Sequence, residues 1–161
     1  MSFTSSDIKE LRNKSGAGMM DCKKALNESN GNIEKAIEWL RKKGINTAQK
    51  KSSRSASDGL ITIDTKNAEA VVIEVNAETD FVARNENFQN FCSALSQTCL
   101  VNKSKDVNEL LNSNFLDSDK SVQESLTDLV SKLGENIVIR RVKYVNEPGL
   151  YFQQYMHNSI N

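Results

Sequence analysis

The strongest constraint on the fold is a change of hydrophobic period within residues 71–99. The first part is typical of a half-buried strand, because Val71, Ile73 and Val75 alternate with Val72, Glu74 and Asn76. The second part predicts a helix whose buried side is formed by Phe88, Phe91, Cys92, Leu95 and Cys99. Between them lies a strand-to-helix corner, where a rigid scaffold commonly presents contact residues: Thr79-Asp80-Phe81-Val82-Ala83-Arg84-Asn85.

Phe81 is the unusual residue of this corner. Burial of a Phe side chain removes about 150–250 Å² from water and stabilises by about 1.5–3 kcal/mol. An exposed Phe81 would forgo that gain, which favours a role in filling a partner's pocket. The alternative is that Phe81 folds back into the chain's own core while Asp80 only caps the helix that begins at Glu86. The spacing by itself leaves both possibilities open.

Composition excludes several classes of function. The 161 residues include 21 Lys and Arg and 21 Asp and Glu, so no net charge attracts nucleic acid or an anionic membrane. No apolar run reaches the roughly 18–20 residues of a membrane span, and residues 1–30 lack the apolar segment of a signal peptide. We expect a cytoplasmic protein whose cysteines, Cys22, Cys92 and Cys99, are reduced residues of the core.

Residues for catalysis, cofactors or metals are poorly represented. The chain has no glycine-rich phosphate loop, so we expect it to bind no nucleotide or other cofactor directly. Its one histidine, His157, is poorly placed for a Cys–His nucleophile pair. The stretch Asp117-Ser118-Asp119 lacks the later glycine and glutamate of a calcium loop. We therefore expect neither an enzyme nor a metal site.

Residues 1–44 predict a compact domain of three helices. The expected boundaries are a capping box at Asp7 and Glu10, a break at residues 15–18, a second helix Met19–Leu26, a cap at Asn32 and a terminal glycine at Gly44. Met19, Cys22 and Leu26 share a face of the second helix. At least one of Met19 and Met20 is therefore expected in the core, because such short helices are stable only when packed together.

The sequence predicts a mobile basic linker at residues 45–58 and an α+β domain at residues 59–161. The six cations between Arg41 and Arg54 could contact RNA, but no aromatic residue is interleaved for base stacking, which favours a solvated tether. The α+β part is expected to be an antiparallel sheet covered by helices on one face. Its predicted strands are Leu60–Thr65, Ala70–Asn76, Ile137–Val145 and Leu150–Met156, and a helix from Val122 ends at Gly134.

Two separate motifs resemble the elongation factor Ts family. The first is Leu11-Arg12-Asn13-Lys14-Ser15-Gly16-Ala17-Gly18-Met19-Met20-Asp21-Cys22-Lys23-Lys24-Ala25-Leu26, continued by Asn30-Gly31-Asn32-Ile33-Glu34-Lys35-Ala36-Ile37-Glu38-Trp39-Leu40-Arg41. The second is the corner, which is similar to the family's Thr-Asp-Phe-Val motif and the Ala-Arg-Asn that follows. The resemblance implies an amino-terminal domain of the ubiquitin-associated type, followed by a linker and the first part of the α+β core.

The resemblance also implies a function in translation. Members of the family are guanine-nucleotide exchange factors that bind elongation factor Tu in its GDP form and disturb the Mg²⁺ and nucleotide site. The residues that match the intruding motif are Thr79, Asp80, Phe81 and Val82, with Phe81 expected to wedge into an apolar slot of the partner. Weaker contacts are expected from Ala83, Arg84, Asn85, Met19 and Met20. Neither a membrane nor nucleic acid is expected as a partner.

In the family, the region around Tyr155 to His157 leads into a second core subdomain with an inserted helical hairpin. The present sequence has neither, so the resemblance covers about the first half of a typical member. Two alternatives to nucleotide exchange remain open. One is a ubiquitin-associated-like adaptor that binds proteins without exchange activity. The other is an RNA-binding protein that uses the basic linker and loses affinity steeply with salt.

Overall fold

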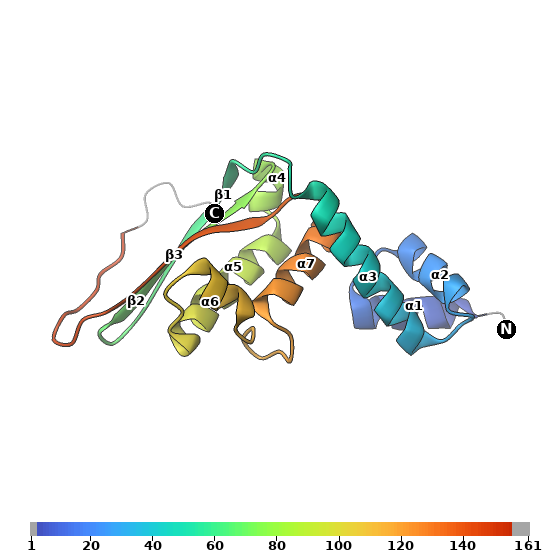
Figure 1. Ribbon diagram of the computed structural model, residues 1–161, viewed down its shortest axis with the longest axis horizontal. Coiled ribbons are helices and arrows are strands. Elements are labelled where there is room, and N and C mark those ends of the chain that lie inside the picture. The colour runs from blue at the N-terminus through green and yellow to red at the C-terminus, as the bar shows by residue number, and fades with distance from the viewer. Residues whose placement is uncertain (1–2, 156–161) are drawn as a thin grey trace.

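The computed structural model describes residues 3–155 and has the predicted α+β architecture (Figure 1). Three helices come first, and a sheet with its own helices follows. The helices are α1 (Ser5–Ser15), α2 (Met19–Glu28), α3 (Ile33–Lys51), α4 (Asp80–Ala83), α5 (Glu86–Asn102), α6 (Val107–Asn112) and α7 (Val122–Leu133). The strands are β1 (Asp58–Lys66), β2 (Glu69–Ala77) and β3 (Val138–Asn146).

Helices α1 to α3 pack around a small core of their own, whose fully buried residues are Leu11, Cys22, Ala25, Leu26 and Ala36. Helix α1 begins with a capping box formed by Thr4 and Asp7. The Thr4 hydroxyl accepts the Asp7 N–H at 3.3 Å, and the Asp7 carboxylate accepts the Thr4 N–H at 2.6 Å. The predicted box of Asp7 and Glu10 is therefore wrong by one turn, and Glu10 forms an ion pair with Lys14 at 2.7 Å instead.

Helix α3 is longer than the sequence predicted. It begins as expected, with the Asn32 side chain accepting the Lys35 N–H at 2.8 Å. The prediction that it ends at Gly44 is wrong, because the helix continues to Lys51. Gly44 is buried where α3 crosses α7, and a Cβ there would lie 3.7 Å from the Ser131 Cβ. A Cβ at that distance would be in ordinary van der Waals contact, so Gly44 is an interior residue of a helix packed on α7 and does not mark a helix end. The division of the chain into domains stays a prediction.

The sheet has the strand order β1-β2-β3, and both pairings are antiparallel. Helices α5, α6 and α7 lie together on one face of the sheet, as predicted (Figure 1). Val71, Ile73 and Val75 of β2 are fully buried on that face, which confirms the alternation seen in the sequence. They share a core with Phe88 and Leu95 of α5, so the change of hydrophobic period places strand and helix against each other.

Helix α7 has the boundaries that the sequence predicted. Ser121 and Glu124 form a capping box at its start. At its end Gly134 adopts the left-handed conformation, with φ of 76°, and its N–H donates to the Val130 carbonyl at 2.9 Å. A left-handed residue favours glycine, because a Cβ would approach the following carbonyl oxygen.

After β3 the chain turns at residues 148–149, as predicted, and the Leu150 N–H donates to the Glu147 carbonyl at 3.1 Å. The predicted fourth strand is wrong over its described part, because residues 150–155 contain no strand. The physical reason is the lack of a neighbour, since no strand within residues 3–155 pairs with this segment. Met156 and His157 lie outside the described residues.

Candidate functional site

The corner at residues 79–85 contains the one-turn helix α4, which links β2 to α5. Thr79 is the N-cap of α4, and its hydroxyl oxygen accepts the Val82 N–H at 3.4 Å. Asn85 is the N-cap of α5, and its side-chain oxygen accepts the Asn87 N–H at 2.9 Å. The strand-to-helix corner is confirmed, with an extra helical turn that the hydrophobic pattern did not reveal.

Phe81 is exposed at this corner, with 81% of its surface accessible to solvent. The alternative in which Phe81 folds back into the core is therefore wrong. The reason is that a single turn has one side facing the core, and Val82 and Ala83 already fill that side. An exposed aromatic side chain next to two buried residues gives the corner an apolar projection.

Asp80 and Arg84 lie beside Phe81 on the surface. The Asp80 carboxylate lies 3.5 Å from the Arg84 guanidinium, and both side chains are more than half exposed. Such an exposed ion pair contributes only about 0–1 kcal/mol, so either group can be released to a partner. The alternative role of Asp80 as the cap of the helix at Glu86 is wrong, because Asn85 occupies that position.

A distant turn between α7 and β3 fixes the corner in place. The Glu135 carboxylate accepts two hydrogen bonds from Thr79, one from the hydroxyl at 2.7 Å and one from the backbone N–H at 3.1 Å. In return, the Glu78 carboxylate accepts the Asn136 N–H at 2.6 Å. Sequence reasoning missed these contacts, because the two turns are 56 and 58 residues apart and neither spacing nor periodicity connects them.

A second exposed apolar point lies at the start of α2, where Met19 is 50% and Met20 is 74% exposed. The expectation that at least one of them belongs to the core is wrong. Cys22 and Leu26 fill the core side of α2, and the methionines are in its first turn, next to the break between α1 and α2. The structure thus has apolar contact points on both its amino-terminal helices and its α+β part.

The cations between Arg41 and Arg54 are largely engaged within the chain. Four of them contact described residues: Lys42 with Glu38, Lys43 with Asp21, Lys51 with the Gly134 carbonyl, and Arg54 with Glu78. A surface that binds RNA needs cations that are free to neutralise phosphates. The three ion pairs among these contacts are exposed and contribute only about 0–1 kcal/mol each, so they do not decide the RNA-binding alternative.

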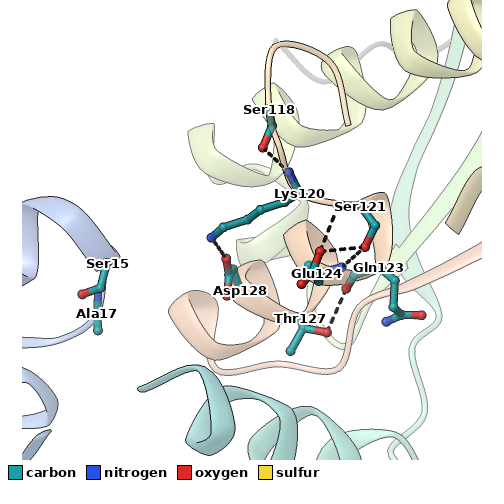
Figure 2. Close-up of polar contacts among 9 residues, drawn as sticks. All are labelled: Ser15, Ala17, Ser118, Lys120, Ser121, Gln123, Glu124, Thr127 and Asp128. Carbon is teal, nitrogen blue, oxygen red and sulfur yellow. Dashed lines mark hydrogen bonds and ion pairs between the residues drawn. The ribbon is translucent and has the colours of Figure 1, made fainter. Parts of the chain in front are cut away.

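A cleft of about 530 Å³ lies between α3, α7 and β3, and most of its lining is apolar. Its titratable residue is Glu124, which Figure 2 shows at the start of α7. The Ser121 N–H and hydroxyl donate to the Glu124 carboxylate at 3.0 and 3.1 Å, and these bonds hold its pKa below the usual value. Glu124 therefore serves as a helix cap, and the cleft offers no pair of groups for acid–base chemistry.

Cys22, Cys92 and Cys99 are all buried and free, as predicted for residues of the core. Burial raises the pKa of the Cys92 thiol to about 12 and that of Cys99 to about 11. Thiols with such pKa values are poor nucleophiles at neutral pH. Within residues 3–155, no cluster of histidine, cysteine and acidic side chains could hold a metal ion, and no helix could span a membrane.

Comparison with known proteins gives consistent results. A sequence model of the family described as Elongation factor TS matches residues 78–161, so the match begins one residue before Thr79. The elongation factor Ts of Mesorhizobium japonicum is 45% identical over 160 residues, which cover 99% of this chain and 52% of that protein. That of Rhodospirillum centenum is 47% identical over 153 residues, 95% of this chain and 50% of that protein.

The elongation factor Ts of Agrobacterium fabrum is 46% identical over 157 residues, which cover 98% of this chain and 51% of that protein. These similarities extend over the amino-terminal helices as well as the α+β part. The chain spans about half the length of the relatives that it matches.

Proposed function

The chain belongs to the elongation factor Ts family, and on this premise we propose that it acts in translation by promoting nucleotide exchange on elongation factor Tu. It binds the GDP form of that partner, and it disturbs the Mg²⁺ and nucleotide site so that GDP leaves and GTP can enter. The motif that contacts the partner is Thr79, Asp80, Phe81 and Val82, of which the exposed Asp80 and Phe81 enter it, while Val82 is buried in the chain's own core and supports the turn. We place this role in the cytoplasm.

The exposure of Phe81 is the observation that carries this proposal. A Phe that is 81% exposed on an anchored corner can transfer most of its surface into a partner's pocket. Burial of such a side chain is worth about 1.5–3 kcal/mol, which corresponds to a rate factor of about ten to one hundred. The corner therefore has enough apolar surface to support an appreciable exchange effect.

The proposed mechanism needs no covalent step and no proton transfer. The chain and the nucleotide each lower the affinity of the partner for the other, and thermodynamic linkage makes the two effects equal. Phe81 supplies the apolar wedge. Asp80, released from its weak pair with Arg84, perturbs the polar groups around the Mg²⁺ ion. The chain itself binds no nucleotide in this scheme.

Weaker contacts are assigned to Ala83, Arg84 and Asn85 at the corner, and to Met19 and Met20 on α2. Ala83 is buried and Asn85 caps α5, so these two shape the corner more than they reach outward. The exposed methionines give the amino-terminal helices an adaptable apolar surface, because Met side chains are flexible and polarizable.

Release of fluorescent GDP from elongation factor Tu tests the proposal. We expect the wild-type chain to accelerate release, and Phe81→Ala to reduce the acceleration by about ten- to one hundredfold, as estimated from side-chain burial. The matched control is Val101→Ala, because Val101 is also exposed (65%) but lies near the other end of α5. The control should retain wild-type activity.

The remaining outcomes separate the alternatives. If the chain binds elongation factor Tu but Phe81→Ala releases GDP as fast as the wild type, the wedge mechanism is wrong. If binding persists without any acceleration, the chain behaves as an adaptor of the ubiquitin-associated type. Absence of both binding and acceleration would show that this half of the family's length does not carry the activity.

A further inference from the structure

Two turns that are distant in sequence hold each other by reciprocal hydrogen bonds. Glu135, after α7, accepts the hydroxyl and the backbone N–H of Thr79 at 2.7 and 3.1 Å. Glu78, after β2, accepts the Asn136 N–H at 2.6 Å. Each carboxylate thus binds the backbone of the opposite turn. Hydrogen bonds to an ionised acceptor are shorter and stronger than neutral ones, so this arrangement resists relative movement of the turns.

The same turns are connected to the end of α3. The Arg54 guanidinium lies 3.5 Å from the Glu78 carboxylate, and the Asn136 side-chain amide donates to the Arg54 carbonyl at 2.8 Å. We call these residues (Arg54, Glu78, Thr79, Glu135 and Asn136) the corner network. It joins the corner to the helix that runs from the amino-terminal core into the α+β part (Figure 1).

Helix α4 needs such external support. It has only four residues, and a helix of one turn is not stable by itself. Its most apolar residue, Phe81, points into solvent and contributes almost no packing. Val82 and Ala83 bury one side of the turn and so set which side faces the core. The two bonds from Thr79 to Glu135 add a restraint at the N-cap of the turn, where no side chain is buried.

We propose that Glu135 is a positioning residue that fixes the direction in which Phe81 projects, both relative to the sheet and, through Arg54 and Asn136, relative to α3. This inference rests on the proposed function for its consequence in exchange. Glu135 itself does not enter the partner. Its role is to keep Phe81 in the orientation of entry before the partner arrives, so that less conformational freedom is lost in the insertion step that releases GDP.

The test uses Glu135→Gln, which keeps the size of the side chain. The Glu135 carboxylate accepts both bonds from Thr79. A glutamine amide has one accepting oxygen, and its NH₂ group is itself a donor, so it cannot accept the second bond. The matched control is Glu69→Gln at the other end of β2. Glu69 is also a carboxylate that accepts a hydroxyl, from Tyr144 at 2.7 Å, and it pairs with Lys103 at 2.9 Å.

The first readout is amide hydrogen exchange of residues 79–84 in the free full chain. We expect Glu135→Gln to speed exchange at these amides by about tenfold, the effect of one lost hydrogen bond to a charged group, and to leave α5 unchanged. Glu69→Gln should leave residues 79–84 as in the wild type. Unchanged exchange at the corner of Glu135→Gln would overturn the proposal, whatever the partner does.

The second readout is the maximal rate of GDP release at saturating chain, measured together with the melting temperature. We expect Glu135→Gln to lower the maximal rate by about tenfold, on the same hydrogen-bond estimate, while Glu69→Gln keeps the wild-type rate. Equal losses of rate and melting temperature in both variants would show a merely structural role and would contradict the proposal. Failure of the wild type to release GDP would refute the proposed function, and the hydrogen-exchange result would still decide the positioning role.

Discussion

The amino-terminal helices and the α+β part each present exposed apolar residues, but they hold them in different ways. Met19 and Met20 lie in the first turn of α2, whose N-cap Gly18 makes no side-chain hydrogen bond. Phe81 lies on a turn whose cap, Thr79, makes hydrogen bonds at 2.7 and 3.1 Å to a distant carboxylate. A flexible side chain on a weakly capped helix suits adaptable docking, whereas a rigid ring on an anchored turn suits insertion at one defined point.

The two parts also differ in the size of their cores. The fully buried residues of the amino-terminal core are small or medium in size: Leu11, Cys22, Ala25, Leu26 and Ala36. The core of the α+β part is larger and includes Phe88 and a stacked pair, Phe91 and Phe115, whose ring centroids lie 5.3 Å apart. A small core leaves little stability in reserve, so the amino-terminal helices should unfold first.

The largest expected effect compares the same substitution in both cores. Leu26→Ala and Leu95→Ala each remove a fully buried side chain and should each cost about 2–5 kcal/mol. We expect Leu26→Ala to unfold α1, α2 and the start of α3 while the sheet stays folded, and Leu95→Ala to lower the melting temperature of the sheet without unfolding it at 25 °C. Amide hydrogen exchange, read separately for each part, measures both. A single cooperative loss over the whole chain would contradict this distinction.

The next effect tests whether docking and insertion are separate. Met20→Ala removes an exposed side chain that we assign to docking, so it should weaken affinity for elongation factor Tu by about fivefold, which corresponds to about 1 kcal/mol. The maximal rate of GDP release at saturating chain should stay unchanged, in contrast to Phe81→Ala. Titrations of GDP release against chain concentration separate the two parameters. A fall in maximal rate with Met20→Ala would mean that both points act together.

A smaller effect is expected at the cap of α2. Gly18 has φ of −62° and ψ of 148°, which serine adopts readily, and a Cβ there would meet nothing within 4 Å. Gly18→Ser should therefore add the missing cap and stabilise the amino-terminal helices by a few tenths of a kcal/mol.

The matched control for this cap is Gly16→Ser. Gly16 has φ of 67°, where a side chain costs about 1–2 kcal/mol, so the control should destabilise the same helices. Thermal unfolding followed by circular dichroism measures both changes. Shifts of the same sign in the two variants would show that capping is not what limits this part of the chain.

The smallest effect concerns acid. The Lys103 ammonium and the Tyr144 hydroxyl, both bound to Glu69, hold the pKa of that carboxyl below its ordinary value of 4.5. Because the pKa is lower in the folded state, this contribution is fully present above about pH 4.5 and is lost as pH falls through the lowered pKa. Glu69→Gln should therefore flatten the acid side of the stability curve of the α+β part. An acid slope identical to that of the wild type would show that other carboxylates dominate it.

Much of the fold was predictable because its signals are local. The alternation of β2 and the caps at Asn32 and Gly134 depend on residues within a few positions of each other. The capping box of α1 was misassigned by one turn, because Asp7 fits both the cap and the third helical position. The fourth strand failed for a different reason. Residues 150–155 have a suitable composition, but a strand needs a neighbour that local sequence does not reveal.

The sequence by itself determined the three amino-terminal helices, the strand-to-helix corner and the identity of the residues at its tip. Only the tertiary structure decided that Phe81 is exposed, because that depends on which side of a single turn the core occupies. It also decided that α3 passes through Gly44, since packing against α7 outweighs the usual tendency of glycine to end a helix. Glu135 was beyond sequence reasoning altogether, because its bonds to Thr79 span 56 residues and exist only once the sheet has formed.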